Sequence, residues 1–427
     1  MNESFLHYIW QFQYFDKNAL TTTDGEAIIV YKQGHHNTDS GPDFSNAKIK
    51  IGTIEWAGHV EIHINASAWN EHRHQHDDAY NNVILHVVWQ NDKPIFAKDG
   101  SRIPTLELKN RIAASLIHHY HQLINTSSVV PCKQSLPQVN DITRLSMSDR
   151  VLVERLQSKS QWIRDVYSST GNDWEEATYQ LLARNFGFKV NNDPFLLLAQ
   201  RLPYKLILKQ SSSIQVEALI FGMAGFLEAG MKDDYFNALQ REFKQHQTKY
   251  RLEDKVLNPA QWRFLRLRPA NFPTIRLAQF SALLSKSRSL FSSIIEAASY
   301  ADLVRLFTTS QSAYWQNHYR FGKKSNSTIS ALGDASIDSL IINSVAPLLT
   351  AYGIERDEPS YIDRAQEILQ QIPAEANTIT RIWDQLNWKV KTAFDSQALT
   401  ELYTHYCKRR NCLNCSIGAS ILRPNAQ

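Results

Sequence analysis

One stretch decides the fold of the N-terminal region. It begins with Gly-Pro-Asp-Phe at residues 41–44, continues with Gly-His-Val-Glu-Ile-His at 58–63 and ends with Val-Ile-Leu-His-Val-Val-Trp at 83–89. Polar and apolar residues alternate through 59–64, which is typical of a β-strand because successive side chains point to opposite faces of a sheet. The apolar face of this strand is predicted to join a core. The other face carries His59, Glu61 and His63, and these groups are costly to bury unless they are paired, metal-bound or hydrated.

Asp43 links this polar face to a second acid. It lies in a Gly-Pro-Asp turn just before a second predicted strand at residues 47–51. If that strand pairs with the strand at 59–64, the carboxyl group of Asp43 approaches Glu61. Carboxylate oxygens are hard ligands that suit Mg²⁺ and Mn²⁺. The alternative is that the polar residues form the solvated outer face of an antiparallel sheet.

The pattern resembles the PD-(D/E)XK nuclease superfamily, in which a Pro-Asp at the start of one strand and an acid-x-Lys on the next hold a divalent metal. The matching positions are Pro42-Asp43 and Glu61-Ile62-His63. The order of predicted elements also agrees: helix 3–15, strands 27–33, 47–51 and 59–64, helix 68–80 and a buried strand 83–89. The resemblance implies an α/β domain over residues 1–125, with a mixed sheet flanked by helices in the restriction-endonuclease-like fold.

The same resemblance implies a function. It predicts a divalent-metal-dependent hydrolase of DNA or RNA phosphodiesters, with Mg²⁺ or Mn²⁺ held by Asp43 and Glu61 and with His63 as a third catalytic residue. His63 stands where the superfamily has lysine. This departure favours an alternative, a non-catalytic nucleic-acid-binding or assembly protein on a decayed nuclease scaffold. A literal acid-x-Lys at residues 107–109 lacks an upstream Pro-Asp and falls at the predicted edge of the sheet.

Histidines in the predicted helix at 68–80 supply further candidates. His72 and His76 are spaced to share one helix face, which would pack beside Glu61, whereas His74 is expected to point elsewhere, at the surface. We therefore predict His59, His72 and His76 as second-shell residues that orient the site. A third possibility is a zinc-dependent hydrolase that uses His59, His63 and either His72 or His76 together with Glu61.

Length and charge set broad limits. A chain of 427 residues is expected to form two or three domains. Its 46 basic and 42 acidic residues give a net charge of +4, which permits contact with nucleic acid. We expect a cytoplasmic protein, since the N-terminus does not resemble a secretory signal, no stretch of about 18 apolar residues spans a membrane and the four cysteines are too few for a disulfide scaffold. The oligomeric state stays open.

The second half of the chain is predicted to be mostly α-helical. Residues 126–142 form a linker, and long periods of apolar residues at helical spacing define a helical domain over 143–400. An arginine-rich loop within it is a candidate to hold a nucleic-acid backbone. The arginines are Arg263, Arg266, Arg268 and Arg276, interleaved with Trp262 and Phe272. The alternative is that the aromatic and proline residues wedge the loop between helices while the arginines pair with local acids.

The cysteines form the last pattern. Cys407, Cys412 and Cys415 give a Cys-x4-Cys-x2-Cys run in a C-terminal segment at 401–427, and Cys132 is the remaining cysteine. Four thiolates can hold a zinc ion or an iron–sulfur cluster. Some nucleases of the superfamily named above clamp a 4Fe–4S cluster with one cysteine near the core and three far away, and the resemblance implies that arrangement here. Three free thiols near a helix end are the alternative.

Nearly the whole chain also resembles an uncharacterised bacterial family of unknown function. The resemblance is carried by Gly-Pro-Asp-Phe at 41–44, Val-Glu-Ile-His at 60–63, Arg-Pro-x-Asn-Phe-Pro at 268–273 and the terminal cysteine stretch. It implies no particular activity.

Overall fold

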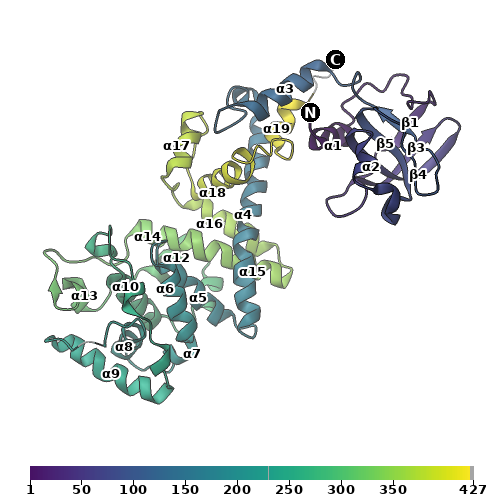
Figure 1. Ribbon diagram of the computed structural model, residues 1–427. Helices are drawn as coiled ribbons and strands as arrows, with labels where there is room; N and C mark the ends of the chain where they lie inside the picture. Colours follow the sequence, from purple (N-terminus) through teal and green to yellow (C-terminus); the bar gives the residue numbers. More distant parts are fainter. Residues whose placement is uncertain (229, 424–427) are drawn as a thin grey trace. The chain divides into compact units, whose positions relative to one another are not determined.

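The computed structural model describes residues 1–228 and 230–423 (Figure 1). Ala229, inside the predicted helical domain, and the last four residues of the predicted C-terminal segment lie outside the described residues. The chain forms two compact units. Unit 1 combines Met1–Met147 with Leu402–Gln427, and unit 2 is Ser148–Glu401. The C-terminal segment is therefore part of the unit that also contains the N-terminus.

A six-stranded mixed sheet forms the centre of unit 1 (Figure 1). The strands are β1 (Ile28–Lys32), β2 (His35–His36), β3 (Phe44–Ile51), β4 (Ile54–Asn65), β5 (Val83–Gln90) and β6 (Thr105–Glu107). Their order is β1-β3-β4-β5-β6, and β2 pairs with β3. The pairs β1–β3 and β3–β4 are antiparallel, whereas β4–β5 and β5–β6 are parallel. The predicted mixed sheet with helices is confirmed. The strands β3 and β4, which contain the predicted strands at 47–51 and 59–64, do pair, but residues 47–51 lie opposite 54–58 and only Phe44 lies opposite Val60.

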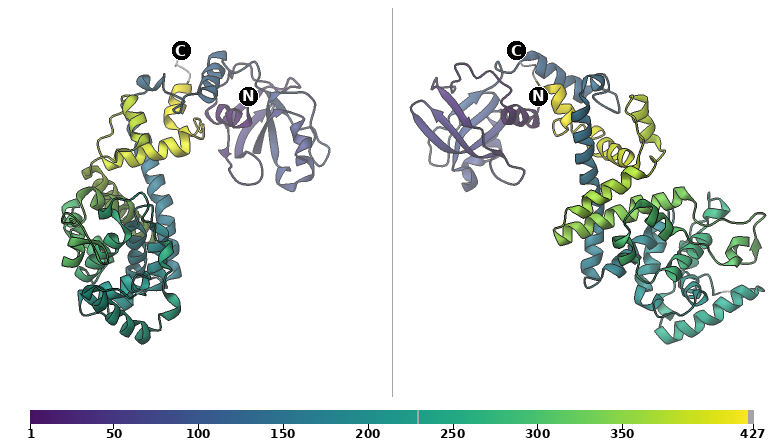
Figure 2. Two further views of the ribbon diagram at one scale, coloured as in Figure 1. Left: turned by 60° about the vertical axis from the view of Figure 1, so that its left-hand side comes forward. Right: turned by 180° about the vertical axis from the view of Figure 1, so that it is seen from behind.

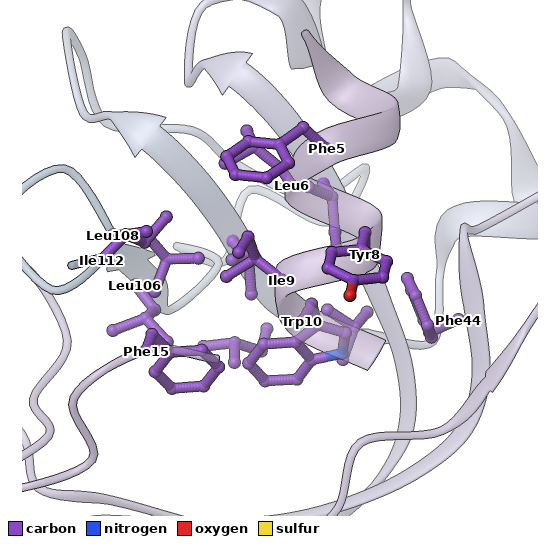
Figure 3. Close-up of a cluster of buried hydrophobic side chains, with 14 of the residues drawn as sticks. Phe5, Leu6, Tyr8, Ile9, Trp10, Phe15, Phe44, Leu106, Leu108 and Ile112 are labelled. Carbon is purple, nitrogen blue, oxygen red and sulfur yellow. The ribbon is translucent and has the colours of Figure 1, made fainter. Parts of the chain in front are cut away.

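Helix α1 (Glu3–Phe12) covers one face of this sheet and creates the main core of unit 1. Asn2 caps the helix by accepting the backbone N–H of Phe5, and the apolar side chains of α1 point into a fully buried cluster. Figure 3 shows Phe5, Leu6, Ile9 and Trp10 among side chains from the sheet and the following loops. Val60 and Ile62 of β4 belong to the same cluster, so the apolar face of β4 lies where its alternating pattern predicted.

The opposite face of the sheet is covered by the connection between β4 and β5. Trp69 is 1% exposed and anchors a second, smaller cluster, where its indole Nε1–H donates to the carbonyl of Phe96 over 3.1 Å. Glu61 and His63 are also buried. Both faces of β4 are therefore covered here, and the polar face is not the solvated side of an antiparallel sheet.

The continuous helix predicted at residues 68–80 is wrong. Helix α2 covers only Ala68–Glu71, and two separate 3₁₀ turns follow, η1 (His74–His76) and η2 (Asp78–Tyr80). Arg73 has a φ of +62°, a left-handed conformation that an α-helix cannot continue through. Asp77 then accepts the N–H of Ala79 and starts the second turn.

The C-terminal segment packs on the N-terminal part of unit 1. Helix α19 (Ser416–Leu422) lies against α3 (Ala114–Asn125), and the Tyr8 hydroxyl donates to the carbonyl of Ala419 over 3.3 Å. Arg410 donates to the carbonyls of Ser128 and Thr126 over 2.7 and 2.8 Å. Gly418 is required at a close approach, because a Cβ there would lie 2.2 Å from the Cys412 carbonyl oxygen.

Unit 2 is mostly helical, as predicted (Figure 2). Helix α4 (Asp141–Ser169) begins in unit 1 and continues into unit 2. The other helices are α5 (Trp174–Phe186), α6 (Asn192–Arg201), α7 (Tyr204–Ile207), α8 (Ser213–Met223), α9 (Asp234–Tyr250), α10 (Pro273–Lys286), α11 (Leu290–Glu296), α12 (Tyr300–Phe307), α13 (Ala313–Asn317), α14 (Asp334–Leu340), α15 (Ala346–Arg356), α16 (Ser360–Gln371), α17 (Thr378–Gln385) and α18 (Ala393–Glu401). A π-helical segment, η7 (Ile341–Val345), joins α14 to α15, and a second one, η8 (Leu402–Cys407), follows α18. Short 3₁₀ turns and the β7–β8 pair (His318–Arg320 and Lys323–Lys324) complete the described elements.

One helix of unit 2 has the length and apolar composition of a membrane-crossing helix. It runs through Asp334–Arg356 with a mean hydropathy of 1.4, and 72% of its apolar window is buried within the protein. The core helix of a globular domain has the same properties, so this helix is weak evidence for a membrane span.

A buried carboxyl group in unit 2 makes its stability depend on pH. Glu217 of α8 is 5% exposed and accepts hydrogen bonds from Trp315 Nε1 at 2.5 Å and from the Tyr235 hydroxyl at 2.8 Å. Burial raises the pKa of Glu217 from 4.5 to about 7. The native state therefore holds a proton that the unfolded chain has released, and the stability from this group is complete below the unfolded pKa and is lost as pH rises through about 7.

We therefore predict that Glu217→Gln raises the free energy of unfolding by up to roughly 3 kcal/mol at pH 8, with little change near pH 5. Glutamine keeps the acceptor oxygen and carries no charge. Calorimetric melting of both proteins across this pH range measures the difference. Parallel melting curves for the two proteins would show that the carboxyl group ionises without cost.

Candidate functional site

The two predicted acids meet at the start of β3. The Asp43 N–H donates to Glu61 Oε2 over 3.1 Å, and the Ile62 N–H donates back to Asp43 Oδ2 over 2.9 Å. Each carboxylate thus accepts a backbone N–H from the segment that carries the other. This reciprocal pair of bonds fixes both side chains across the β3–β4 pairing.

The surroundings of the acid pair contain imidazoles instead of lysine or arginine. His7 Nε2 lies 3.3 Å from Asp43 Oδ2, and Glu61 Oε1 lies 3.4 Å from His74 Nε2 and 3.6 Å from His63 Nε2. No Lys or Arg forms an ion pair with either acid within the described residues. Burial, and after it the neighbouring Asp43 carboxylate, raise the pKa of Glu61 well above its usual value.

Three histidines form a cluster with metal-ligand spacing beside Glu61. The ligand nitrogens of His63, His72 and His74 lie within 4.8 Å of one another, and His63 Nε2 is 3.2 Å from His72 Nδ1. In the part of the chain that the structure describes, no other group of three or more His, Cys, Asp or Glu ligand atoms is this close. His63 comes from β4, whereas the other two come from the irregular connection that follows it.

His63 is held in place by His86 of β5. His63 Nδ1 lies 2.8 Å from His86 Nε2, and the two strands are parallel neighbours there. Burial and the surrounding histidines lower the pKa of His63 to about 2, and burial lowers that of His86 to about 3. Both rings are therefore neutral. If Nδ1 of His63 carries its proton and donates it to His86, the lone pair on Nε2 faces the cluster, as in a metal-binding histidine oriented by a second partner.

The predicted second-shell histidines divide into two groups. His72 reaches the cluster although its side chain is mostly exposed. His76 is exposed, and His59 makes no side-chain hydrogen bond or ion pair with Asp43, Glu61 or His63 within the described residues. The expectation that His74 lies at the surface, away from the site, is wrong. Because residues 68–80 do not form one continuous helix, His72 and His76 do not share a helix face. The 3₁₀ turn instead points His74 toward Glu61.

Three histidines at or beside the site were not predicted. His86 lies within an apolar run of the sequence, so it was not recognised as a site residue. It pairs with Glu61 in the parallel register of β4 and β5, which places both side chains on the same face of the sheet. His7 lies on the helix that covers the opposite face and reaches Asp43 at the strand end. His74 stacks on Tyr80 with ring centroids 3.9 Å apart. Local pattern gave no signal for these last two positions.

The donor set fits a transition metal better than Mg²⁺. His74 Nε2 is buried and makes no hydrogen bond, so it is free to bind an ion. In a tetrahedral site with Zn–N bonds of about 2.0–2.1 Å, ligand nitrogens are roughly 3.3 Å apart, and the 3.2 Å between His63 Nε2 and His72 Nδ1 agrees with this. Glu61 Oε1 lies beside the three histidines, at 3.4 Å from His74 Nε2 and 3.6 Å from His63 Nε2. Imidazole suits Zn²⁺ and related ions, whereas Mg²⁺ favours oxygen ligands.

The four cysteines all belong to unit 1, and none of them forms a disulfide within the described residues. Cys407 ends η8, Cys412 and Cys415 precede α19, and the Cys132 carbonyl accepts the N–H of Leu136 over 2.8 Å. Burial, followed by the thiols of the other three, raises the pKa of Cys407. Burial and two of these thiols likewise raise the pKa of Cys132 to about 12. Cys132, which is far in sequence from the other three cysteines, is therefore near enough for their charges to act on it. Within the described residues, no three of the four sulfur atoms all lie within 4.8 Å of one another.

The acid-x-Lys at residues 107–109 has structural contacts. Glu107 Oε2 accepts the N–H of Asn91 over 2.9 Å, and Lys109 donates to Gln90 over 2.9 Å. The glutamate belongs to β6, at the edge of the sheet as predicted. These contacts tie β6 and the residue after it to the end of β5.

The arginine-rich loop lies in unit 2. Some of its arginines are exposed, and one is held by hydrogen bonds to neighbouring side chains. Arg263, Arg266 and Arg268 are exposed. Arg276 is held by Asn271, Gln279 and Ser336 and lies 4.1 Å from the centre of the Phe188 ring. Trp262 is buried and donates to the Ala224 carbonyl over 2.9 Å. The exposed arginines therefore stay candidates for binding a phosphate backbone, whereas Trp262 stabilises the loop.

Comparison with known proteins identifies one family. A family model described as "Protein of unknown function (DUF2851)" matches residues 3–378. The match ends before the three C-terminal cysteines. No curated protein and no solved structure matches the chain.

We predict that the histidine cluster binds Mn²⁺ and that this binding depends on His74. His74→Ala should weaken Mn²⁺ binding by at least about tenfold, since it removes a buried donor nitrogen. His76→Ala is the matched control because the same 3₁₀ turn presents this histidine to solvent. An electron paramagnetic resonance titration with Mn²⁺ measures the affinity, and Mn²⁺ avoids the thiols because it favours oxygen and nitrogen donors. Equal losses in both variants would contradict this site.

Proposed function

We propose that this chain, which belongs to the DUF2851 family of proteins of unknown function, is a metal-dependent phosphodiesterase acting on nucleic acid. The observation that carries the proposal is the meeting of the acid pair, Asp43 and Glu61, with the imidazoles of His63, His72 and His74 at one end of β4. The phosphodiester substrate is proposed from the mixed sheet and from the place of Pro42-Asp43 before β3 and Glu61-x-His63 on β4, which resembles the pattern of the PD-(D/E)XK nucleases except that those have lysine at the position of His63.

The residues divide the work by position. The three imidazoles would hold the ion, with Glu61 beside them as an oxygen donor or proton acceptor. Such an ion lowers the pKa of a bound water and stabilises charge on phosphoryl oxygens. Water adds to phosphorus while the bond to the leaving sugar oxygen breaks, and Glu61 would accept the proton that the water loses. His7, which lies 3.3 Å from Asp43, is placed to return a proton to the leaving oxygen.

The acid pair explains why Glu61 suits the role of proton acceptor. A general base works best when its pKa is near the working pH. Burial and the adjacent carboxylate both push the pKa of Glu61 upward from its usual value. The two backbone N–H bonds keep the carboxylates from moving apart. An isolated exposed glutamate has neither property.

A second candidate function follows from the histidine at position 63. A decayed nuclease scaffold would bind nucleic acid and not cut it. The exposed arginines of unit 2 and the net charge of +4 are compatible with this reading. Binding that persists in a chelator without any strand cleavage would select it over the catalytic proposal.

We further propose that Cys132, Cys407, Cys412 and Cys415 hold a structural zinc ion or a 4Fe–4S cluster. Their support is the electrostatic proximity of the thiols and the close packing of Gly418 on Cys412, which shapes the turn between Cys412 and α19. A cation would relieve the cost of burying thiolates there. The role is structural because the segment fastens the C-terminus to the core that contains α1.

We predict that the full chain cleaves DNA or RNA with Mn²⁺ or Zn²⁺ and that Asp43→Asn lowers the rate by at least about 10²-fold, because the carboxylate that positions Glu61 and His7 is lost. Glu107→Gln is the control acid, since an amide oxygen can still accept the N–H of Asn91. Cleavage of a fluorescent oligonucleotide measures the rates, and melting temperatures confirm folding.

The same variants distinguish two arrangements of the ion. If the imidazoles are the main ligands, Asp43→Asn keeps Mn²⁺ and His74→Ala loses it. The reverse result would place the ion between the two carboxylates, as the sequence pattern predicted. If Asp43→Asn and His74→Ala both cleave at the wild-type rate, the proposal that these residues take part in catalysis is wrong.

For the cysteine site, we predict stoichiometric iron or zinc in protein purified without oxygen. Iron would give a brown protein with broad absorption near roughly 400 nm, as expected for thiolate-held clusters. Cys407→Ser should lose this metal and melt at a lower temperature, while Mn²⁺ binding at the histidine cluster is retained. Metal-free wild-type protein of normal stability would show that the thiols have no ligand role.

A further inference from the structure

Unit 2 contains a polar cavity of about 800 Å³ that the metal centre does not use. Its wall is formed by α4 and α5, by the loop that follows α5, by α14 and η7, and by the region from Glu375 to Thr400. Every lining residue lies between Arg155 and Thr400, so the cavity belongs to one unit. Its volume is in the range of pockets that bind small organic ligands.

The charges that line this cavity are mostly positive. Four cations, Arg155, Lys159, Arg184 and Lys189, face one acid, Glu375. Arg155 is already paired with Glu401 at 3.0 Å, and its Nε donates to Gln397 over 2.6 Å. The other three cations have no ion pair within the described residues. The cavity therefore has more positive charge than its own acids balance.

Lys159 is the cation best placed to meet a ligand. Its Nζ donates to Asn343 Oδ1 over 3.1 Å and to Gln397 Oε1 over 3.0 Å. Both acceptors are neutral amides, and an ammonium group has three protons to donate. One proton is left for a group in the cavity. Burial, followed by the nearby Arg155, lowers the pKa of Lys159 to about 7, although the carboxylates of Glu375 and Glu401 act in the opposite direction.

The remaining lining suits a ligand with polar groups besides its charge. Asn185, Asn192, Asn377, Ser158 and Thr378 also line the cavity. Each of the three carboxamides makes hydrogen bonds to backbone groups with one of its ends, Nδ2 in Asn185 and Oδ1 in the other two. Such groups donate to and accept from hydroxyls or heterocyclic nitrogens. Two aromatic rings, Trp162 and Phe188, add apolar surface, and each is covered on one side by an arginine, Arg184 at 4.9 Å and Arg276 at 4.1 Å.

We propose that this cavity binds a phosphorylated small molecule, whose phosphate meets Lys159 and Lys189 and whose polar body meets the carboxamides. Lysine is a common phosphate ligand because it presents a point charge with several donors. The cavity would thus give the helical unit a ligand-binding role of its own. This inference goes beyond the proposed nuclease and does not depend on it, because every lining residue belongs to unit 2 and the proposed metal ligands belong to unit 1.

Two substitutions test the proposal by adding negative charge to neighbouring positions on α4. Ser158 is exposed and lines the cavity, whereas Gln157 is exposed and does not line it. Ser158→Glu should weaken binding of adenosine 5′-monophosphate to the full chain by at least about tenfold through repulsion, and Gln157→Glu should change it less than about twofold. Isothermal titration calorimetry measures both affinities, and inorganic phosphate, pyrophosphate and adenosine are the comparison probes.

A second pair of variants removes one positive charge each. Lys159→Gln should weaken phosphate and nucleotide binding to a similar degree, while Lys244→Gln, on the exposed face of α9, should not. Lys189→Gln, an exposed lining position, replaces Lys159→Gln if the latter does not fold. Tighter binding of the nucleotide than of inorganic phosphate would show that the body of the ligand is recognised, and equal affinities would show that the phosphate alone is.

Two results would overturn the proposal. One is that none of the phosphate-containing probes binds to wild-type protein, or that each binds equally well to wild type and Ser158→Glu. The other is that a single-stranded oligonucleotide binds in a manner sensitive to Ser158→Glu while no small phosphate does, because the cavity would then be part of a nucleic-acid surface.

Discussion

The reciprocal backbone bonds between Asp43 and Glu61 are the constraint on which the rest of the N-terminal site depends. The Asp43 N–H and the Ile62 N–H each bind the carboxylate of the other segment, so the acids stay together despite their repulsion. The pair combines a buried Glu61 with a half-buried Asp43, and neither has a Lys or Arg partner within the described residues, which is expensive. The neighbouring His63 and His86 rings contact each other and stay neutral, so they add no positive charge. The arrangement can accept an ion or a proton, and nothing else nearby balances it.

Much of the sheet followed from local pattern, and much of the site did not. The alternation through residues 59–64 predicted which side chains of β4 enter the core, and the Gly-Pro-Asp turn predicted where β3 begins, so the approach of the two acids could be foreseen. The helix at 68–80 could not be judged from spacing alone. The left-handed backbone at Arg73 breaks it, and the residue types at these positions do not predict that conformation. Because the helix is interrupted at Arg73, His74 and not His76 joins His63 and His72 in the cluster.

Long-range association accounts for the other differences. His7 and His86 reach the site from α1 and β5, and only the assembled sheet shows that these positions meet. The C-terminal segment is a similar case, because its return to unit 1 rests on bonds such as Tyr8 to Ala419 and Arg410 to Thr126. Such contacts join residues hundreds of positions apart, and no local periodicity encodes them. The cysteine spacing predicts that these residues act together, whereas the return of Cys407, Cys412 and Cys415 to the unit that contains Cys132 had to come from the structure.

The histidine at position 63 changes the electrostatics of the scaffold that its pattern resembles. A lysine there would place a fixed positive charge beside Glu61 and lower the pKa of that carboxyl group. His63 does the opposite, since its own pKa falls to about 2 and it stays neutral. The missing positive charge must then come from elsewhere. Protons on His63, His72 and His74 cannot supply it together, because three imidazolium ions with nitrogens within 4.8 Å would repel one another. A single metal ion held by neutral rings would avoid that repulsion and would also balance the acids, so under the proposed function the ion takes the place of the lysine charge.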